Sequence, residues 1–281
     1  MGALAHGRRH GVRTDGLDLE LSVVIPVKDE EQNLPLLHEE LTRALGGTGI
    51  DYEIVIVDDG STDGTFSQLE QMYQRDARVR VIRFVRNFGQ TAAFAAGFAA
   101  ARGRFVATLD GDLQNDPADI PRLLALAARH DIVCGWRRER HDAWLTRKVP
   151  SAIANWLIGI VSGTRLHDNG CSLKVFRADI VKRLNLRPGM HRYLPALAVQ
   201  LGNGVVEEVV NHRPRRFGHS KYGLSRTFQV VADLLQLPAL KRRAVDPHAP
   251  RPQLYQISEM LAHEAERPVA AAGARPSATL S

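Results

Sequence analysis

The 281-residue sequence has few cysteines, no long apolar run and no apolar segment near its start. Two cysteines, Cys134 and Cys171, cannot build a disulfide framework or a multi-thiolate zinc site, which favours a reducing compartment. The first 16 residues lack the apolar core of a secretory signal. The nearest approach to a membrane span is residues 149–164, whose roughly 24 Å as a helix falls short of a ~30 Å hydrocarbon core. We therefore expect no transmembrane helix.

Aromatic residues are also scarce, at 6% of the chain, whereas 37 Lys and Arg give a formal net charge of +6. This excess of positive charge favours anionic partners: nucleic acid, a nucleotide, a phospholipid or a phosphorylated lipid. Stacking platforms and a recognisable reading helix for nucleic acid are both missing. A non-catalytic nucleic-acid-binding protein is thus the weakest hypothesis, and salt-sensitive DNA binding would be needed to support it.

Short apolar runs alternate with helical patterns from residue 21 onward. The expected strands are Leu21–Val27, the run "YEIVIVDD", Val79–Asn87, Arg104–Asp112 and Asp131–Trp136. Helices are expected up to about residue 45, over residues 89–103 and over residues 117–129. Near-continuous apolar strands alternating with helices predict an α/β fold, a Rossmann-like, mostly parallel sheet flanked by helices. No G-x-G-x-x-G follows the first strand, which excludes the usual dinucleotide fold.

The chain divides into three parts on this pattern. Residues 1–20 are polar and rich in Gly and Arg, and we expect them to be disordered. Residues 21–241 form the predicted domain, with amphipathic helices near residues 144–163 and 222–240. Residues 242–281 are expected to be a flexible tail that holds at most a short helix within "QLYQISEMLAHEAE".

Acidic motifs follow three of the expected strands: "IPVKDE", "VDDGS" and "LDGD". In open α/β sheets, ligands bind beyond the carboxyl ends of the strands, so these motifs should converge on one site. In "LDGDLQ", two carboxylates and an amide would present oxygen atoms to a hard divalent cation, Mg²⁺ or Mn²⁺. The alternative is a solvated Asp-Gly-Asp turn. Asp59, Ser61 and Asp63 fit caps of the following turn and helix.

Five motifs together carry a family resemblance: "VVIPVKDEEQNL", "VIVDDGSTDGT", "VRNFGQTAAFAAGF", "TLDGDLQNDP" and "GHSKYG". In this order, over Leu21 to Leu235, they resemble family-two glycosyltransferases of the GT-A fold, in particular dolichyl- or polyprenyl-phosphate glycosyltransferases. The resemblance implies inverting transfer of a sugar from a UDP- or GDP-linked donor to a lipid phosphate such as undecaprenyl or dolichyl phosphate. It also implies a divalent metal. Because many members of the family carry transmembrane helices and none is expected here, we expect the basic residues to hold a cytoplasmic enzyme peripherally on the anionic inner face of the plasma membrane.

The resemblance assigns residues to the donor side. Asp112 and Gln114 would ligate the metal, and Asp110 would face the ribose or the metal shell. The expected nucleotide-sugar contacts are Pro26, Val27, Glu30, Asp58, Asp110 and Asp168. Lys28 and Asp29 replace the Tyr-Asn pair that usually precedes this glutamate, and Asp168 fits a turn as well as a sugar contact.

The resemblance also assigns cationic residues to the acceptor. A lipid phosphate is already ionised, so it needs cations that hold it rather than a general base. The candidates are Arg137, Arg147, Ser151, Arg215 and Lys221, whereas Arg138, Arg140, Arg213 and Arg216 are expected at the surface or on phospholipid. Arginine runs can equally be solvated faces. The two amphipathic helices fit either an interfacial position or a core position.

Two enzyme hypotheses therefore remain open. The absence of a membrane anchor favours a family-two transferase with a soluble or sugar-hydroxyl acceptor, whereas the arginine and lysine set favours a lipid phosphate. A processive polysaccharide synthase is disfavoured because the Q-x-x-R-W signature is missing. The donor sugar cannot be derived from these motifs, and a uridine nucleotide is only weakly favoured over a guanosine one.

Overall fold

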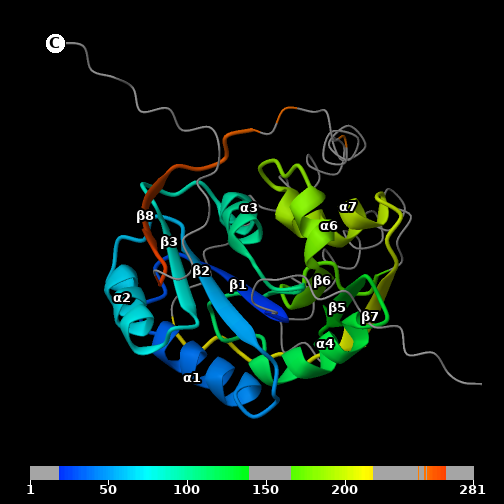
Figure 1. Cartoon of the computed structure of the whole chain (residues 1–281), viewed down its shortest axis with the longest axis horizontal. Helices are drawn as coiled ribbons and strands as arrows, with labels where there is room; N and C mark the ends of the chain where they lie inside the picture. Colours follow the sequence, from blue (N-terminus) through cyan, green and yellow to red (C-terminus); the bar gives the residue numbers. More distant parts are fainter. Residues whose placement is uncertain (1–18, 139–165, 218–245, 247–249, 251, 264–281) are drawn as a thin grey trace, which may run out of the picture.

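The computed structural model describes residues 19–138, 166–217, 246, 250 and 252–263. These residues form an eight-stranded sheet in the order β7-β5-β6-β4-β1-β2-β3-β8 (Figure 1). Strands β6 and β8 run antiparallel to their neighbours, and the remaining pairs, β1–β2, β1–β4, β2–β3 and β5–β7, are parallel. The predicted mostly parallel α/β sheet is confirmed.

The first half of the fold follows the predicted alternation of strands and helices. Its elements are β1 Leu21–Val27, α1 Leu34–Leu45, β2 Tyr52–Asp58, α2 Thr65–Arg75, β3 Val79–Phe84, α3 Gln90–Ala100, β4 Phe105–Thr108, the 3₁₀ turn η1 Pro117–Asp119, α4 Ile120–Ala127 and β5 Ile132–Trp136. Every residue of β1 and β2 is buried, as expected for strands covered on both faces. The five predicted strands are therefore all present.

The second half contains shorter elements and an unexpected last strand. It comprises β6 Lys174–Arg177, α6 Ala178–Arg183, η3 Met190–Tyr193, α7 Leu194–Val199, β7 Val205–Val209 and β8 Ile257–Leu261. The short helix expected within residues 253–266 is wrong for the described part of that range, because residues 257–261 instead pair antiparallel with β3. The open edge of β3 offers backbone hydrogen bonds, and the ring of Tyr255 stacks on Phe84 with centroids 5.0 Å apart.

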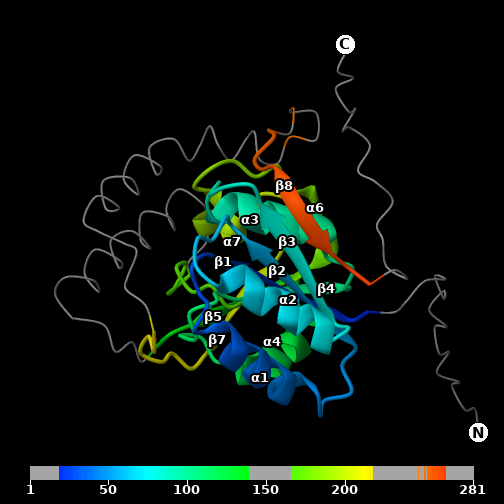
Figure 2. The same ribbon diagram turned by 90° about the vertical axis from the view of Figure 1, so that its left-hand side faces the viewer.

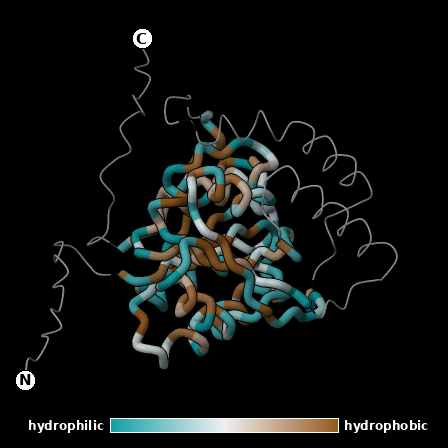
Figure 3. The backbone as a smooth tube through the Cα atoms, turned by 90° about the vertical axis from the view of Figure 1, so that its right-hand side faces the viewer, coloured by the Kyte–Doolittle hydropathy of each residue, from teal (hydrophilic) through white to brown (hydrophobic). Residues whose placement is uncertain are grey.

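Two helical layers cover the sheet (Figures 1 and 2). Helices α1, α2 and α4 pack on one face and α3, α6 and α7 on the other, and each face has its own apolar cluster. The hydropathy colouring of Figure 3 shows the apolar segments gathered in the interior. Helix α3 lies close to β1 because Gly97 has no side chain: a Cβ there would be 2.3 Å from Cγ1 of Val24.

Several predicted features lie outside the described residues. They include the amphipathic helices near residues 144–163 and 222–240, and most of both terminal segments. The division of the chain at residues 20 and 241 stays a prediction, although β8 extends the sheet beyond residue 241. None of the helices in the described part combines the length and apolar character needed to cross a bilayer.

Candidate active site

The acidic motifs converge at the carboxyl ends of β1, β2 and β4. In the sheet register, Val27 pairs with Asp58, and β4 lies on the other side of β1. The turn after β4 packs against the end of β1, since a Cβ on Gly111 would be only 2.9 Å from Cγ1 of Val27. The carboxylates of "VDDGS" and "LDGD" therefore flank one strand end, as the sequence predicts.

The turn from Asp110 to Gln114 is tightly constrained. Leu113 is buried and adopts a φ of 62°, a left-handed conformation that costs free energy in a residue with a Cβ. Oδ1 of Asp112 accepts a hydrogen bond from the backbone N–H of Gln114 at 3.2 Å. Oδ2 accepts one from Nη2 of Arg215 at 2.6 Å. Both carboxylate oxygens of Asp112 are therefore engaged, one by the turn and one by a distant arginine.

Asp110 is held by a residue to which the sequence assigned no role. Nε2 of Gln90, the first residue of α3, donates to Oδ1 of Asp110 at 2.8 Å. Burial and then the charge of Asp112 raise the pKa of Asp110 to about 6. A hydrogen bond from Ser172 and the charges of Lys174 and Arg137 act in the opposite direction. Gln90 lies within the motif "VRNFGQTAAFAAGF", which is the signal that could have identified it.

Asp58 combines full burial with an open acceptor. Its Oδ1 accepts from the backbone N–H of Ser61 at 2.9 Å. Its Oδ2 accepts no hydrogen bond from the part of the chain that the structure describes, although Nε of Arg83 lies 3.6 Å away. A buried carboxylate oxygen of this kind can accept an N–H from a ligand.

The loops after β1 and β2 interlock beside Asp58. Nζ of Lys28 donates to the carbonyl of Gly60 at 3.0 Å, and the backbone N–H of Thr62 donates to Oδ1 of Asp29 at 2.8 Å. Asp29 adopts a positive φ of 49°, which brings its carboxylate to this loop. Lys28 and Asp29, where the sequence departs from the family pattern, therefore hold the two loops together.

The remaining donor-side residues also lie in these loops. Pro26 and Val27 are buried at the end of β1, and Oε2 of Glu30 accepts from Nδ2 of Asn33 at 2.6 Å. The hydroxyl of Ser61 accepts from the backbone N–H of Asp29, and Oδ1 of Asp63 accepts from the N–H of Thr65 at the start of α2. Asp63 thus has the predicted role at the start of the following helix, whereas Ser61 instead ties this loop to the loop after β1.

Asp59 differs from its predicted role as a cap of the following turn or helix. Its carboxylate accepts from the backbone N–H groups of Phe88 at 2.6 Å and Gly89 at 2.9 Å. Those residues immediately precede α3, so Asp59 fixes the loop that presents Gln90. Burial raises the pKa of Asp59 despite these two hydrogen bonds. The cap prediction is wrong because both carboxylate oxygens accept from the loop after β3 instead.

Arg137 and Asp168, predicted to bind the acceptor and the donor sugar respectively, contact one another. Nε and Nη2 of Arg137 donate to the two carboxylate oxygens of Asp168 at 2.7 and 3.0 Å. Although burial acts to lower it, these bonds and the charge of Asp168 raise the pKa of Arg137. The backbone N–H of Asp168 donates to Oε1 of Glu207, which fixes the pair. Direct ligand roles for both residues stay predictions.

The structure places one further acceptor-side candidate at the site. Arg215, after β7, contacts Asp112 as described above, whereas Arg147, Ser151 and Lys221 lie outside the described residues. Arg213 was expected at the surface or on phospholipid, but its guanidinium pairs with Glu40 at 2.9 Å and Asp116 at 2.7 Å. Arg213 therefore anchors this segment to α1 and to the turn after β4.

Two buried polar residues near the site were not predicted. Nζ of Lys174, on β6, donates to the carbonyl of Cys171 and contributes positive charge near Asp110. The side chain of Asn169 is buried and makes no hydrogen bond with the described residues. Both belong to the "HDNGCSLKVF" segment, in which polar residues directly precede an apolar strand.

The side-chain oxygens of Asp110, Asp112 and Gln114 fit a divalent cation only when a bound phosphate supplies further ligands. Within the residues that the structure describes, no group of three or more His, Cys, Asp or Glu side chains is arranged to hold a metal. Asp110, Asp112 and Gln114 offer two carboxylates and one amide, all oxygen ligands. Mg²⁺ and similar ions are commonly bound by one or two carboxylates together with phosphate oxygens and water. The residues therefore fit a metal that arrives with a diphosphate.

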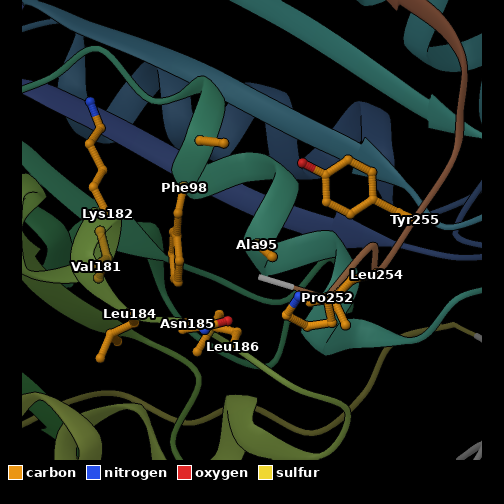
Figure 4. Close-up of a pocket in the computed structure, with 11 residues that line it drawn as sticks. Ala95, Phe98, Val181, Lys182, Leu184, Asn185, Leu186, Pro252, Leu254 and Tyr255 are labelled. Atoms are coloured by element: carbon orange, nitrogen blue, oxygen red, sulfur yellow. The ribbon is translucent and has the colours of Figure 1, made fainter. Parts of the chain in front are cut away.

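A pocket of mixed polar and apolar lining elsewhere in the fold is separate from these residues. It measures about 370 Å³ and lies between α3, α6 and residues 252–255 (Figure 4). Phe98, Val181 and Tyr255 contribute to its lining, and none of the candidate catalytic residues does. The pocket is therefore not the candidate active site.

Comparison with known proteins identifies related chains. A profile of the family described as Glycosyl transferase family 2 matches residues 22–184. The dodecaprenyl-phosphate galacturonate synthase of Rhizobium johnstonii is 45% identical over 234 residues, covering 82% of this chain and 69% of the relative. The undecaprenyl-phosphate 4-deoxy-4-formamido-L-arabinose transferase of Edwardsiella ictaluri is 38% identical over 217 residues, covering 76% and 66%. The chain thus spans about two thirds of the length of these relatives.

Solved structures share the fold. Glucosyl-3-phosphoglycerate synthase of Mycobacterium tuberculosis, crystallised with Mn²⁺, uridine diphosphate and glucosyl-3-phosphoglycerate, aligns with a TM-score of 0.62 at 17% identity, covering 81% of each chain. The same enzyme with Mn²⁺ and UDP-glucose gives a TM-score of 0.59 at 17% identity, covering 81% of this chain and 80% of that one. These similarities concern the architecture, which is that of GT-A glycosyltransferases.

Proposed function

The chain belongs to glycosyl transferase family 2, and from that membership we propose that it transfers a sugar from a nucleoside diphosphate donor to a polyprenyl phosphate, with inversion at the anomeric carbon. The names of both relatives describe transfer to a polyprenyl phosphate. The observation that carries the proposal is the convergence of Asp58, Asp110 and Asp112 beside the end of β1.

On the donor side, Asp58 would bind the nucleotide base through its open Oδ2, which can accept the N3–H of uracil. The uridine diphosphate complexes of the structural neighbours support a uridine donor. Asp112 and Gln114, with Asp110 beside them, would hold Mg²⁺ or Mn²⁺ against the diphosphate. When bound, such an ion stabilises the negative charge that develops on the leaving diphosphate.

On the acceptor side, an ionised phosphate oxygen would form the new bond to the anomeric carbon as the bond to the diphosphate oxygen breaks. No proton has to be removed from the nucleophile, so no general base is required. Arg215, together with Arg147, Ser151 and Lys221, would hold the phosphate in line with the leaving group. Arg137 is matched by Asp168 and would position that loop beside the donor sugar.

The polyprenyl acceptor requires contact with a lipid surface. The formal net charge of +6 suits an anionic bilayer, so we place the protein peripherally on the cytoplasmic face of the plasma membrane. The charge of the phosphate and the length of a polyprenyl chain make binding at that surface the direct route to the acceptor.

The test is transfer of radiolabel from a panel of uridine diphosphate sugars, with Mn²⁺, to undecaprenyl phosphate in detergent. Label should enter the organic phase, and Asp112→Ala should lower the rate about a hundred- to a thousandfold while far-UV circular dichroism stays unchanged. The matched control is Asp51→Ala, which removes an exposed aspartate at the other end of the sheet. Label that stays in the aqueous phase on a soluble acceptor would contradict the lipid proposal. Wild-type turnover by Asp112→Ala would contradict the metal mechanism.

A further inference from the structure

The contact between Arg215 and Asp112 joins a proposed phosphate-binding cation to a proposed metal ligand. Nη2 of Arg215 donates to Oδ2 of Asp112 at 2.6 Å, and the two side chains are 22% and 11% exposed. A charge-assisted hydrogen bond of this length in a partly buried site is among the stronger polar contacts in proteins. The guanidinium is therefore the present counterion of Asp112.

A divalent cation and this guanidinium would compete for the same oxygen. A cation ligated at about 2.0–2.1 Å from Oδ2 would stand within a few ångströms of the guanidinium, and two positive charges at that separation repel each other. The other oxygen, Oδ1, is already occupied by the N–H of Gln114. Arg215 would therefore lose its hold on Asp112 when the donor complex binds.

The chain around Arg215 would allow the Arg215–Asp112 ion pair to separate. Two residues earlier, Arg213 is fixed by its ion pairs with Glu40 and Asp116, and its backbone N–H donates to the carbonyl of Gln114 at 2.8 Å. Pro214 between them is exposed. The segment is thus anchored at residue 213, whereas the side chain of Arg215 forms one ion pair, with Asp112, among the residues that the structure describes.

We propose that Arg215 binds two anions in turn: Asp112 before the metal–nucleotide donor is loaded, and the acceptor phosphate afterwards. This inference rests on the proposed function and adds an order to it, because the acceptor-binding arginine becomes available only when the donor side is complete. Thermodynamic linkage requires the reverse as well: a phosphate that holds Arg215 away from Asp112 strengthens metal binding.

The first experiment measures Mn²⁺ binding to the full chain at a fixed concentration of uridine diphosphate and without acceptor, from the electron paramagnetic resonance signal of free Mn²⁺. Arg215→Met should bind Mn²⁺ about fivefold more tightly than Arg216→Met, because only the first variant removes the competing counterion. The two variants lose the same charge at adjacent positions, and Arg216 is exposed, so general attraction for cations changes equally. Asp112→Asn should weaken binding in both backgrounds.

The second experiment measures binding of a water-soluble, short-chain isoprenyl monophosphate by calorimetry. In the wild-type chain its affinity should rise about fivefold when Mn²⁺ and uridine diphosphate are both present, and this gain should disappear in Arg215→Met but persist in Arg216→Met. A melting curve for each variant checks that the fold is retained.

The outcomes separate this inference from the function on which it rests. Equal Mn²⁺ affinities of Arg215→Met and Arg216→Met, together with weaker binding by Asp112→Asn, would overturn the exchange of partners and leave the proposed function standing. Mn²⁺ binding that does not depend on Asp112 in any background would overturn both.

Discussion

Buried carboxylates are hydrogen-bonded differently at the two ends of the sheet. At the amino ends of the strands, Glu53 accepts from the hydroxyl of Ser22 at 2.6 Å, from the backbone N–H of Arg102 at 2.7 Å and from Nη1 of Arg80 at 3.0 Å. At the carboxyl ends, Asp58 is equally buried, but its Oδ2 accepts nothing from the described chain. At the amino ends both oxygens of the buried carboxylate are hydrogen-bonded, although Nε of Arg80 is buried without a partner among the described residues. At the carboxyl ends a carboxylate oxygen is left open where a ligand can supply a donor.

The same contrast extends to charge. Although burial acts to raise it, hydrogen bonds and the two arginines lower the pKa of Glu53, so the group is charged and matched. At the other end, burial and a neighbouring carboxylate raise the pKa of Asp110 to about 6. Repulsion between Asp110 and Asp112 is the electrostatic reason that this end would gain from a bound cation.

Glu53→Gln, at the amino end, should have the largest effect on the free energy of unfolding. This change leaves Arg80 and Arg102 without their counterion, and we expect the free energy of unfolding to fall by about 3–5 kcal/mol in urea denaturation. Mn²⁺ binding per folded molecule should not change, because the proposed metal site lies at the other end of the sheet. Glu20→Gln, at an exposed position, is the matched control. A loss below about 1 kcal/mol would show that the network does not carry stability.

A change at the carboxyl end should instead lower activity and leave stability nearly unchanged. Gln90→Ala removes the hydrogen bond to Asp110, so we expect kcat to fall roughly 10- to 100-fold with the free energy of unfolding altered by less than about 1 kcal/mol. Steady-state kinetics and urea denaturation of the same preparations measure both quantities. Gln74→Ala, at an exposed position on α2, is the control. Equal losses of stability and activity would mean that Gln90 only supports the fold.

The smallest expected effect is a pH dependence at the amino end. Although burial opposes it, hydrogen bonds from Arg78 and His38 lower the pKa of Asp76 from 3.8 to about 2. Because the folded-state pKa is depressed, the stabilisation is complete above about pH 4 and is lost as the pH falls towards 2. The difference in unfolding free energy between wild type and Asp76→Asn should therefore shrink by about 1–2 kcal/mol from pH 5 to pH 2. A constant difference would contradict this origin.

Strand positions were predictable because each of β1 to β5 is a compact apolar run bounded by polar residues. Strand β8 was not predictable, because "ISEML" contains three good helix formers and its strand geometry comes from the edge of β3. Tertiary pairing overrides local preference at this position.

The location of the site followed from topology, but the pairing of its charges did not. Strand order and the acidic motifs were enough to bring Asp58, Asp110 and Asp112 together. The partners of Arg137 and Arg215 lie 31 and 103 residues away along the chain, a separation that no local pattern encodes. Motifs therefore identified the charged residues, whereas only the three-dimensional arrangement shows which charges are already matched.

The late pairing of β8 also has a consequence for synthesis on the ribosome. Phe84 of β3 pairs with Ile257, which is translated 173 residues later. At about 5–20 residues per second, this interval lasts roughly 10 to 35 seconds. During that time the outer N–H and C=O groups of β3 have no β8 to pair with, and such an edge invites association between nascent chains on one polysome. We therefore expect chaperones to engage the emerging polypeptide until residue 261 has left the exit tunnel.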